Sequence, residues 1–192
     1  MTKAHSASME KDQYILELFQ TAPKEAFRLL FDTYHLKLCL FVVRFTDSFE
    51  MAEDIVQDFF VYFWEKKSYR QIKHNLRRYL YTSVRNASVA ALQKHNLLSM
   101  ETLSGIDMQH FMEDIEKGEE EEQKEEHFRL LPGKLEKLTP QERLVVTAVI
   151  LENKKYKEAA GELNISINTL KTLLSRALKR LRKEYNLFSL FL

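Results

Sequence analysis

Residues 156–185 read YKEAAGELNISINTLKTLLSRALKRLRKEY, and this stretch decides the fold of the second half of the chain. Apolar residues recur at helical spacing, which predicts a short helix over 156–163 and a longer one that Ser166 caps. Asn164 occupies the turn, because asparagine tolerates the left-handed backbone better than any residue except glycine. The spacing that a helix-turn-helix needs is met by Ala160, Asn164, Leu170 and Leu173. We therefore predict a helix-turn-helix here.

The second helix of this motif has polar and basic residues in its first turns. Those that would face the bases in a DNA major groove are Asn168, Thr169, Lys171, Thr172 and Ser175. Arg176 and Lys179 would lie near phosphates. The alternative is an ordinary amphipathic hairpin with a solvated polar face, and this pattern is compatible with both.

The helix before the motif has a clear start signal. Thr139 can cap it, Pro140 suits the first helical position, and Glu142 can close a capping box. These residues predict a helix over 140–152.

Composition favours helices throughout the chain. Its 192 residues include only four glycines and three prolines, which are too few turn-forming residues for a turn-rich β fold. The abundant Leu, Glu, Lys and Ala are helix formers. We predict an all-α protein of two small helical domains, joined by an acidic flexible linker, with the helix-turn-helix in the second domain.

Cysteine and hydropathy patterns point to the cytoplasm. Cys39 is the only cysteine, so no disulfide or multi-cysteine metal site can form within one chain. We expect no signal peptide, and no apolar run approaches the roughly 20 residues that span a bilayer.

Charges are segregated along the chain, although the net charge is only +1. Residues 66–94 include basic residues and no acidic ones. Acidic residues dominate over 101–126, and basic residues dominate again over 154–183. We predict a tail and lead-in at 1–22, a first domain at 23–97, a linker at 98–118 and a second domain at 119–192.

Tyrosines are interleaved with the cations of 66–94, a combination that suits single-stranded or opened DNA. We predict a helix from Asn75. Its inward side chains would be Leu76, Tyr79, Leu80, Val84 and Ala87. Its outward side chains would be Arg77, Arg78, Tyr81, Arg85 and Asn86. The alternative is an ordinary solvated basic face.

Residues 52–65, AEDIVQDFFVYFWE, predict an acidic and aromatic helix. Asp58 lies four residues after Asp54 on the same face. It is too far into the helix for the dipole at the helix N-terminus to explain an acidic residue at this position. The aromatic residues are too many for one core stripe, so some must face a neighbour or a partner. Such a face suits a basic groove on another protein.

In this order, the motifs resemble an extracytoplasmic-function (ECF) sigma factor of the sigma-70 family, especially the type common in Bacteroidetes. Residues 52–65 resemble the segment that binds the clamp helices of the polymerase. Residues 72–86, IKHNLRRYLYTSVRN, resemble the segment that recognises and opens the minus-10 element. Residues 138–145 and 156–185 resemble the domain that reads the minus-35 element. The resemblance implies three partners, which are the bacterial RNA polymerase core, double-stranded and melted promoter DNA, and an anti-sigma factor.

The resemblance also implies three groups of site residues. Core polymerase would be bound by Asp54, Gln57, Asp58, Phe60 and Trp64. The minus-10 element would be bound by Arg77, Tyr81, Arg85 and Asn86. The minus-35 element would be bound by Asn168, Thr169, Lys171, Thr172, Ser175 and Arg176. The chain departs from the family pattern after Asn86, where Ala90 and Gln93 replace an acidic and a basic residue, and at Lys155, which replaces a capping serine.

We predict no catalytic site, cofactor, metal or small-molecule substrate, and hence no enzyme. The six histidines have no paired metal-ligand spacing, and the chain has no glycine-rich phosphate loop. Asp54 and Asp58 have no third ligand nearby. Two other classes stay open. A helix-turn-helix regulator with an N-terminal sensing or dimerisation domain would not explain the basic, aromatic stretch, and a protein-only adaptor would explain neither basic segment.

Overall fold

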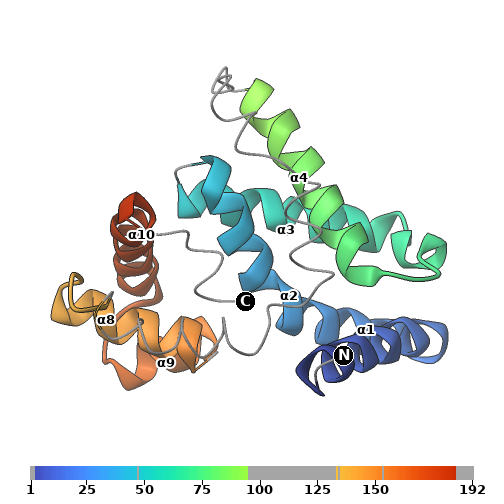
Figure 1. Cartoon of the computed structure of the whole chain (residues 1–192), viewed down its shortest axis with the longest axis horizontal. Coiled ribbons are helices and arrows are strands. Elements are labelled where there is room, and N and C mark those ends of the chain that lie inside the picture. The colour runs from blue at the N-terminus through green and yellow to red at the C-terminus, as the bar shows by residue number, and fades with distance from the viewer. Residues whose placement is uncertain (1–2, 47, 95–132, 134, 153, 185–192) are drawn as a thin grey trace. The chain divides into compact units, whose positions relative to one another are not determined.

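The computed structural model describes residues 3–46, 48–94, 133, 135–152 and 154–184. These residues form helices and turns, with no strand among them, and belong to two compact units (Figure 1). The prediction of an all-α fold with two helical domains is confirmed. The acidic linker predicted at 98–118 lies outside the described residues.

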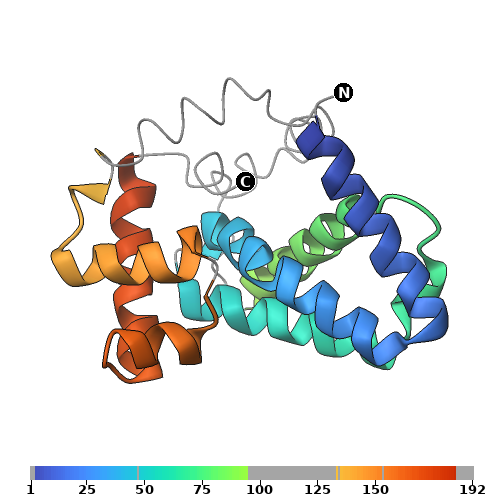
Figure 2. The ribbon, with the colours of Figure 1, turned by 90° about the horizontal axis from the view of Figure 1, so that it is seen from below.

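Two helices that meet at a sharp bend begin the first unit (Figure 2). They are α1 (Lys3–Thr21) and α2 (Pro23–Thr46). Pro23 causes the bend, because proline has no N–H to donate and its ring does not fit inside a continuing helix. Backbone hydrogen bonds from Ala22 to Leu18 (2.8 Å) and from Ala26 to Ala22 (3.0 Å) flank this position.

The structure corrects the prediction that residues 1–22 are a tail, because α1 belongs to the core of the first unit. Ile15, Leu16 and Phe19 are buried, and α1 packs against both α2 and α4. The Phe19 ring stacks on Tyr69, with the ring centroids 4.4 Å apart. The sequence before Gln13 is polar and gave no sign of this helix, and the buried side chains described above all follow Gln13.

Three further elements complete the first unit. They are α3 (Phe49–Glu65), the 3-10 turn η1 (Ser68–Gln71) and α4 (Leu76–Lys94). On α4, every fourth side chain is buried, namely Leu76, Leu80, Val84, Ser88 and Leu92. The inward orientation predicted for the leucines and the valine is confirmed.

Of the two α4 tyrosines, the predicted outward orientation of Tyr81 is wrong, and the predicted inward orientation of Tyr79 is confirmed only in part. Tyr81, expected to face outward, is only 1% exposed and packs edge-on against Phe41 of α2, with centroids 5.2 Å apart. Tyr79, expected in the core, is half-buried and contacts the ring of Phe63 of α3. Because α4 has neighbours on both flanks, its buried arc is wider than the single stripe that the sequence suggested.

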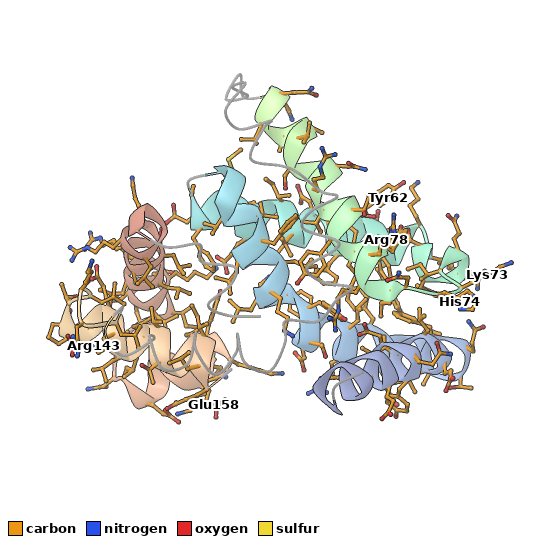
Figure 3. The ribbon with its side chains drawn as sticks, viewed as in Figure 1. Tyr62, Lys73, His74, Arg78, Arg143 and Glu158 are labelled. Atoms are coloured by element: carbon orange, nitrogen blue, oxygen red, sulfur yellow. The ribbon has the colours of Figure 1, made fainter. Side chains whose placement is uncertain are left out.

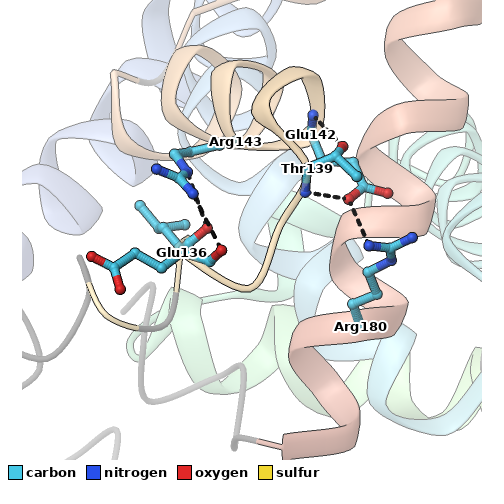
Figure 4. A network of polar contacts seen from close by, with 6 residues as sticks. Glu136, Thr139, Glu142, Arg143 and Arg180 are labelled. Atoms are coloured by element: carbon cyan, nitrogen blue, oxygen red, sulfur yellow. Dashed lines mark hydrogen bonds and ion pairs between the residues drawn. The ribbon is translucent and has the colours of Figure 1, made fainter.

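In the second unit, the helix that follows Thr139 begins with the capping box that the sequence predicts (Figure 4). The Glu142 N–H donates to the Thr139 hydroxyl (3.3 Å), and the Thr139 N–H donates to the Glu142 carboxylate (3.0 Å). The helix α8 (Pro140–Val146) then continues into a π-helical turn, η2 (Thr147–Leu151). The Glu142 carboxylate also lies 3.5 Å from an Arg180 nitrogen, which ties the cap to the last helix.

The helix-turn-helix consists of α9 (Tyr156–Glu162) and α10 (Ile167–Glu184). Asn164 between them has φ 53°, the left-handed conformation that the sequence predicts. Ser166 accepts a hydrogen bond from the Thr169 N–H (3.0 Å) and so caps α10. The contact between the two helices buries Ala160, Leu170 and Leu174. At Lys155 no side-chain hydrogen bond caps α9, as its sequence leads us to expect.

Candidate polymerase and DNA interfaces

One face of α3 is exposed along its whole length. Asp54, Gln57 and Asp58 lie on this face, as the sequence predicts. The same spacing of three and four residues continues through Val61, Tyr62 and Glu65, which are also exposed. We call these six residues the α3 face. It combines three carboxylates with two large apolar side chains, and Figure 3 labels Tyr62 on it.

Two of the predicted polymerase-binding residues lie elsewhere on α3. Phe60 is only 2% exposed, and its ring lies 5.0 Å from Phe31 and 5.9 Å from Phe27, centroid to centroid. Trp64 is half-buried, 5.0 Å from Phe27. Both residues therefore belong to an aromatic cluster with α2. The missed members of the exposed face are Val61, Tyr62 and Glu65, which the continued three-and-four spacing from Asp54 would have identified.

A basic connector follows the α3 face. Its exposed side chains include four cations and a histidine, and they continue into the first turn of α4: Lys66, Lys67, Arg70, Lys73, His74 and Arg78. Figure 3 labels the last three of these. Lys67 and Asn75 have left-handed backbones, with φ 52° and 59°. The Asn75 side chain accepts a hydrogen bond from the Arg78 N–H (3.4 Å), so the left-handed residue also marks the start of α4.

The four predicted minus-10 residues are not on one surface. Asn86 is exposed and Arg85 half-buried, and an Arg85 guanidinium nitrogen donates to the Asn86 side-chain oxygen (3.2 Å). Tyr81 lies in the core, where it cannot stack on a DNA base. Arg77 is half-buried beside Asp12, with 3.6 Å between the Arg77 Nε and a carboxylate oxygen. Arg78, which the sequence placed outward but outside the predicted site, is exposed.

The predicted minus-35 residues share the first turns of α10. Asn168, Thr169, Thr172 and Arg176 are exposed, whereas Lys171 and Ser175 are half-buried. The Lys171 Nζ lies over the Tyr156 ring, 5.6 Å from its centroid, in a cation–π contact between α10 and α9. The Thr172 hydroxyl donates to the Asn168 carbonyl (2.9 Å). Cations and polar groups thus surround a helix start, where the helix dipole also favours phosphate.

Two ion pairs made by Lys154 stabilise the α9 end of the helix-turn-helix. The Lys154 ammonium lies 2.8 Å from the Glu152 carboxylate and 2.5 Å from that of Glu162. Hydrogen bonds to these two carboxylates raise the pKa of Lys154. Lys154 therefore connects the end of η2 to α9 across the exposed turn.

The described residues contain no group of three or more acidic, histidine or cysteine side chains placed to hold a metal ion. Within the same part of the chain, no helix is both long and apolar enough to cross a bilayer.

Two family models match the chain in the order of these interfaces. Residues 30–97 match sigma-70 region 2 and residues 129–181 match sigma-70 region 4, together more than half of the chain. The chain belongs to the sigma-70 family. It is an RNA polymerase sigma factor, and its partners are core RNA polymerase and promoter DNA. The alternative of a regulator with an N-terminal sensing domain is excluded, because that half of the chain matches region 2.

Known sigma factors resemble the chain over most of its length. It is 26% identical to the ECF RNA polymerase sigma factor SigX of Bacillus subtilis, over 85% of this chain and 86% of that protein. It is 23% identical to the RNA polymerase sigma-H factor of Pseudomonas aeruginosa, over 92% and 94%. These matches support the ECF subfamily, for which an anti-sigma partner is typical. The resemblance to the Bacteroidetes type stays a prediction.

Proposed function

We propose that this sigma factor binds core polymerase through the α3 face. The observation that supports the proposal is the exposure of Tyr62 and Val61 between carboxylates on an otherwise core-forming helix. Exposed aromatic and aliphatic side chains flanked by charge are typical of protein interfaces. Carboxylates at Asp54 and Asp58 would meet a basic partner surface, and complementary charge speeds association.

For the minus-10 element, we propose that the outer face of α4, formed by Arg78, Arg85 and Asn86, binds the opened strand. The basic connector before it would hold phosphates in place. This proposal replaces Arg77 and Tyr81 of the sequence-based set with Arg78, because the first two side chains are turned toward the core.

For the minus-35 element, we propose that the first turns of α10 enter the major groove. We further propose that the protein has no catalytic activity of its own and acts in the cytoplasm, where bacterial polymerase transcribes DNA. The test is transcription from a genomic promoter library by core polymerase with and without the protein. Promoter-specific transcripts that require the protein are the expected result, and an unchanged transcript set would contradict the proposal.

In the second unit, Lys171→Ala and Arg176→Ala should both weaken binding to minus-35 DNA, but in different ways. Arg176 is exposed, so we expect a phosphate contact, whose loss weakens binding to all sequences and reduces the salt slope by about one. The Lys171 ammonium lies over the Tyr156 ring, and we expect it to face the bases, so its loss should relax preference at one base position. Salt-dependent binding and selection of sites from random DNA separate the two effects.

The matched control in this unit is Gln141→Ala, an exposed position at the start of α8. It should change neither the salt slope nor the selected sequence. If Lys171→Ala selects the same sequence as the parent protein, the base-side role of Lys171 is wrong.

A further inference from the structure

A single carboxylate joins three helices of the first unit. Asp12 of α1 accepts a hydrogen bond from the Tyr34 hydroxyl of α2 through one oxygen. Its other oxygen lies 3.6 Å from the Arg77 Nε of α4. The side chains of Arg77 and Asp12 are only 22% and 16% exposed. Arg77 also interacts with Tyr34, so the three side chains form one network.

The environment of Asp12 favours the protonated carboxyl over the ionised one. Burial raises the pKa of Asp12, although the Tyr34 hydrogen bond and the charges of Arg77, Lys37 and Lys11 lower it. A raised pKa means that the fold favours the protonated carboxyl over the ionised one. Burial and the Asp12 charge also raise the pKa of Tyr34, which therefore stays protonated and donates its hydrogen.

The raised pKa of Asp12 predicts how the stability of the protein changes with pH. The contribution of Asp12 is fully present below its unfolded pKa and is lost as the pH rises through the raised folded value. Relative to Asp12→Asn, the free energy of unfolding of the parent protein should therefore fall between about pH 4 and pH 7. Urea melts over that range measure it. A difference that grows in favour of the parent protein as the pH rises would contradict the raised pKa of Asp12.

The network of Asp12, Tyr34 and Arg77 does fix the orientation of α4. The core stripe of α4 is apolar apart from Ser88, whose hydroxyl donates to the Val84 carbonyl of the same helix, and apolar contacts are non-directional. A charge-assisted contact has a defined geometry, and Arg77 is the residue next to Arg78, about 100° around the helix. Holding Arg77 against Asp12 therefore sets the rotation of α4 about its axis. That rotation decides how Arg78, Arg85 and Asn86 meet DNA.

We propose that Asp12 and Tyr34 are positioning residues for promoter recognition, which act through Arg77 to orient the DNA-facing side of α4. The proposal rests on the role proposed above for that face. Asp12 lies outside the part of the chain that matches region 2, because that match begins at residue 30.

The test compares holoenzymes made with the full-length protein and its variants on matched and mismatched minus-10 elements. Asp12→Asn keeps the size of the side chain and one acceptor, but removes the charge. We expect it to lower the ratio of opening rates on matched and mismatched promoters by about tenfold. Its urea midpoint at neutral pH should stay equal to that of the parent protein or rise. Tyr34→Phe should move the ratio in the same direction, and Glu17→Gln, an exposed acid on α1, should not.

A purely structural role gives a different pattern. It would lower opening on both promoters by the same factor, in step with the urea midpoint, and would overturn the proposal. In an Arg77→Gln background, Asp12→Asn should have no further effect on the ratio, and a full effect there would also overturn it. If Arg85→Ala and Asn86→Ala leave the ratio unchanged, the role of the α4 face fails, and this proposal with it. If those variants lower the ratio and Asp12→Asn does not, only the positioning proposal fails.

Discussion

Tyr62→Ala should weaken the binding of core polymerase by about a hundredfold and leave the stability of the protein unchanged. The Tyr62 side chain is 57% exposed on the α3 face, so its removal opens no cavity. Large aromatic side chains at the centre of an interface contribute most of its free energy. Asp58→Lys should act in the same direction, because it reverses a charge that we expect to meet a basic surface. Equilibrium titration of labelled protein with core enzyme measures both.

The neighbouring Phe60 provides the contrast for this experiment. Phe60→Ala removes a ring packed between Phe27 and Phe31 and should lower the free energy of unfolding by about 3–5 kcal/mol. Its effect on polymerase binding should follow the loss of folded protein. Glu17→Lys, an exposed charge reversal in the C-terminal half of α1, should leave both affinity and stability unchanged. Parental affinity in both Tyr62→Ala and Asp58→Lys would remove the α3 face from the polymerase interface.

Arg85→Ala should slow transcription from a duplex promoter by about tenfold or more, and from a template with a pre-melted minus-10 bubble far less. The reason is that a contact with an unpaired strand is needed most while the strands are still being separated. A contact made only to the backbone would be lost equally on both templates, since the phosphate is present in each. Permanganate footprints should lose their unpaired thymines while polymerase still occupies the promoter.

Tyr81 separates this effect from loss of folding. Because Tyr81 packs edge-on against Phe41, Tyr81→Ala should destabilise the first unit and reduce transcription from both templates alike. Gln20→Ala, an exposed change on α1, should affect neither template. If Arg85→Ala lowers activity equally on both templates and occupancy falls with it, the α4 face is an electrostatic anchor without a role in melting.

Local patterns were enough to predict much of this protein. The capping box at Thr139, the left-handed turn at Asn164 and the cap at Ser166 each depend on residues within four positions of one another. Their chemistry is therefore readable from the sequence itself. The exposed half of α3 was also within reach, because three-and-four spacing from Asp54 leads to Val61 and Tyr62.

Sequence periodicity was enough to show which residues share a helix face, whereas the packing of distant segments determines which faces are covered. Periodicity is a property of one helix, but burial depends on neighbours that the chain supplies from elsewhere. Tyr81 is buried because Phe41 of α2 lies beside it, and Phe60 is buried because α2 covers it with two more rings. Arg77 is turned toward α1 because Asp12, distant in sequence on that helix, provides a partly buried counter-charge that no pattern within α4 records.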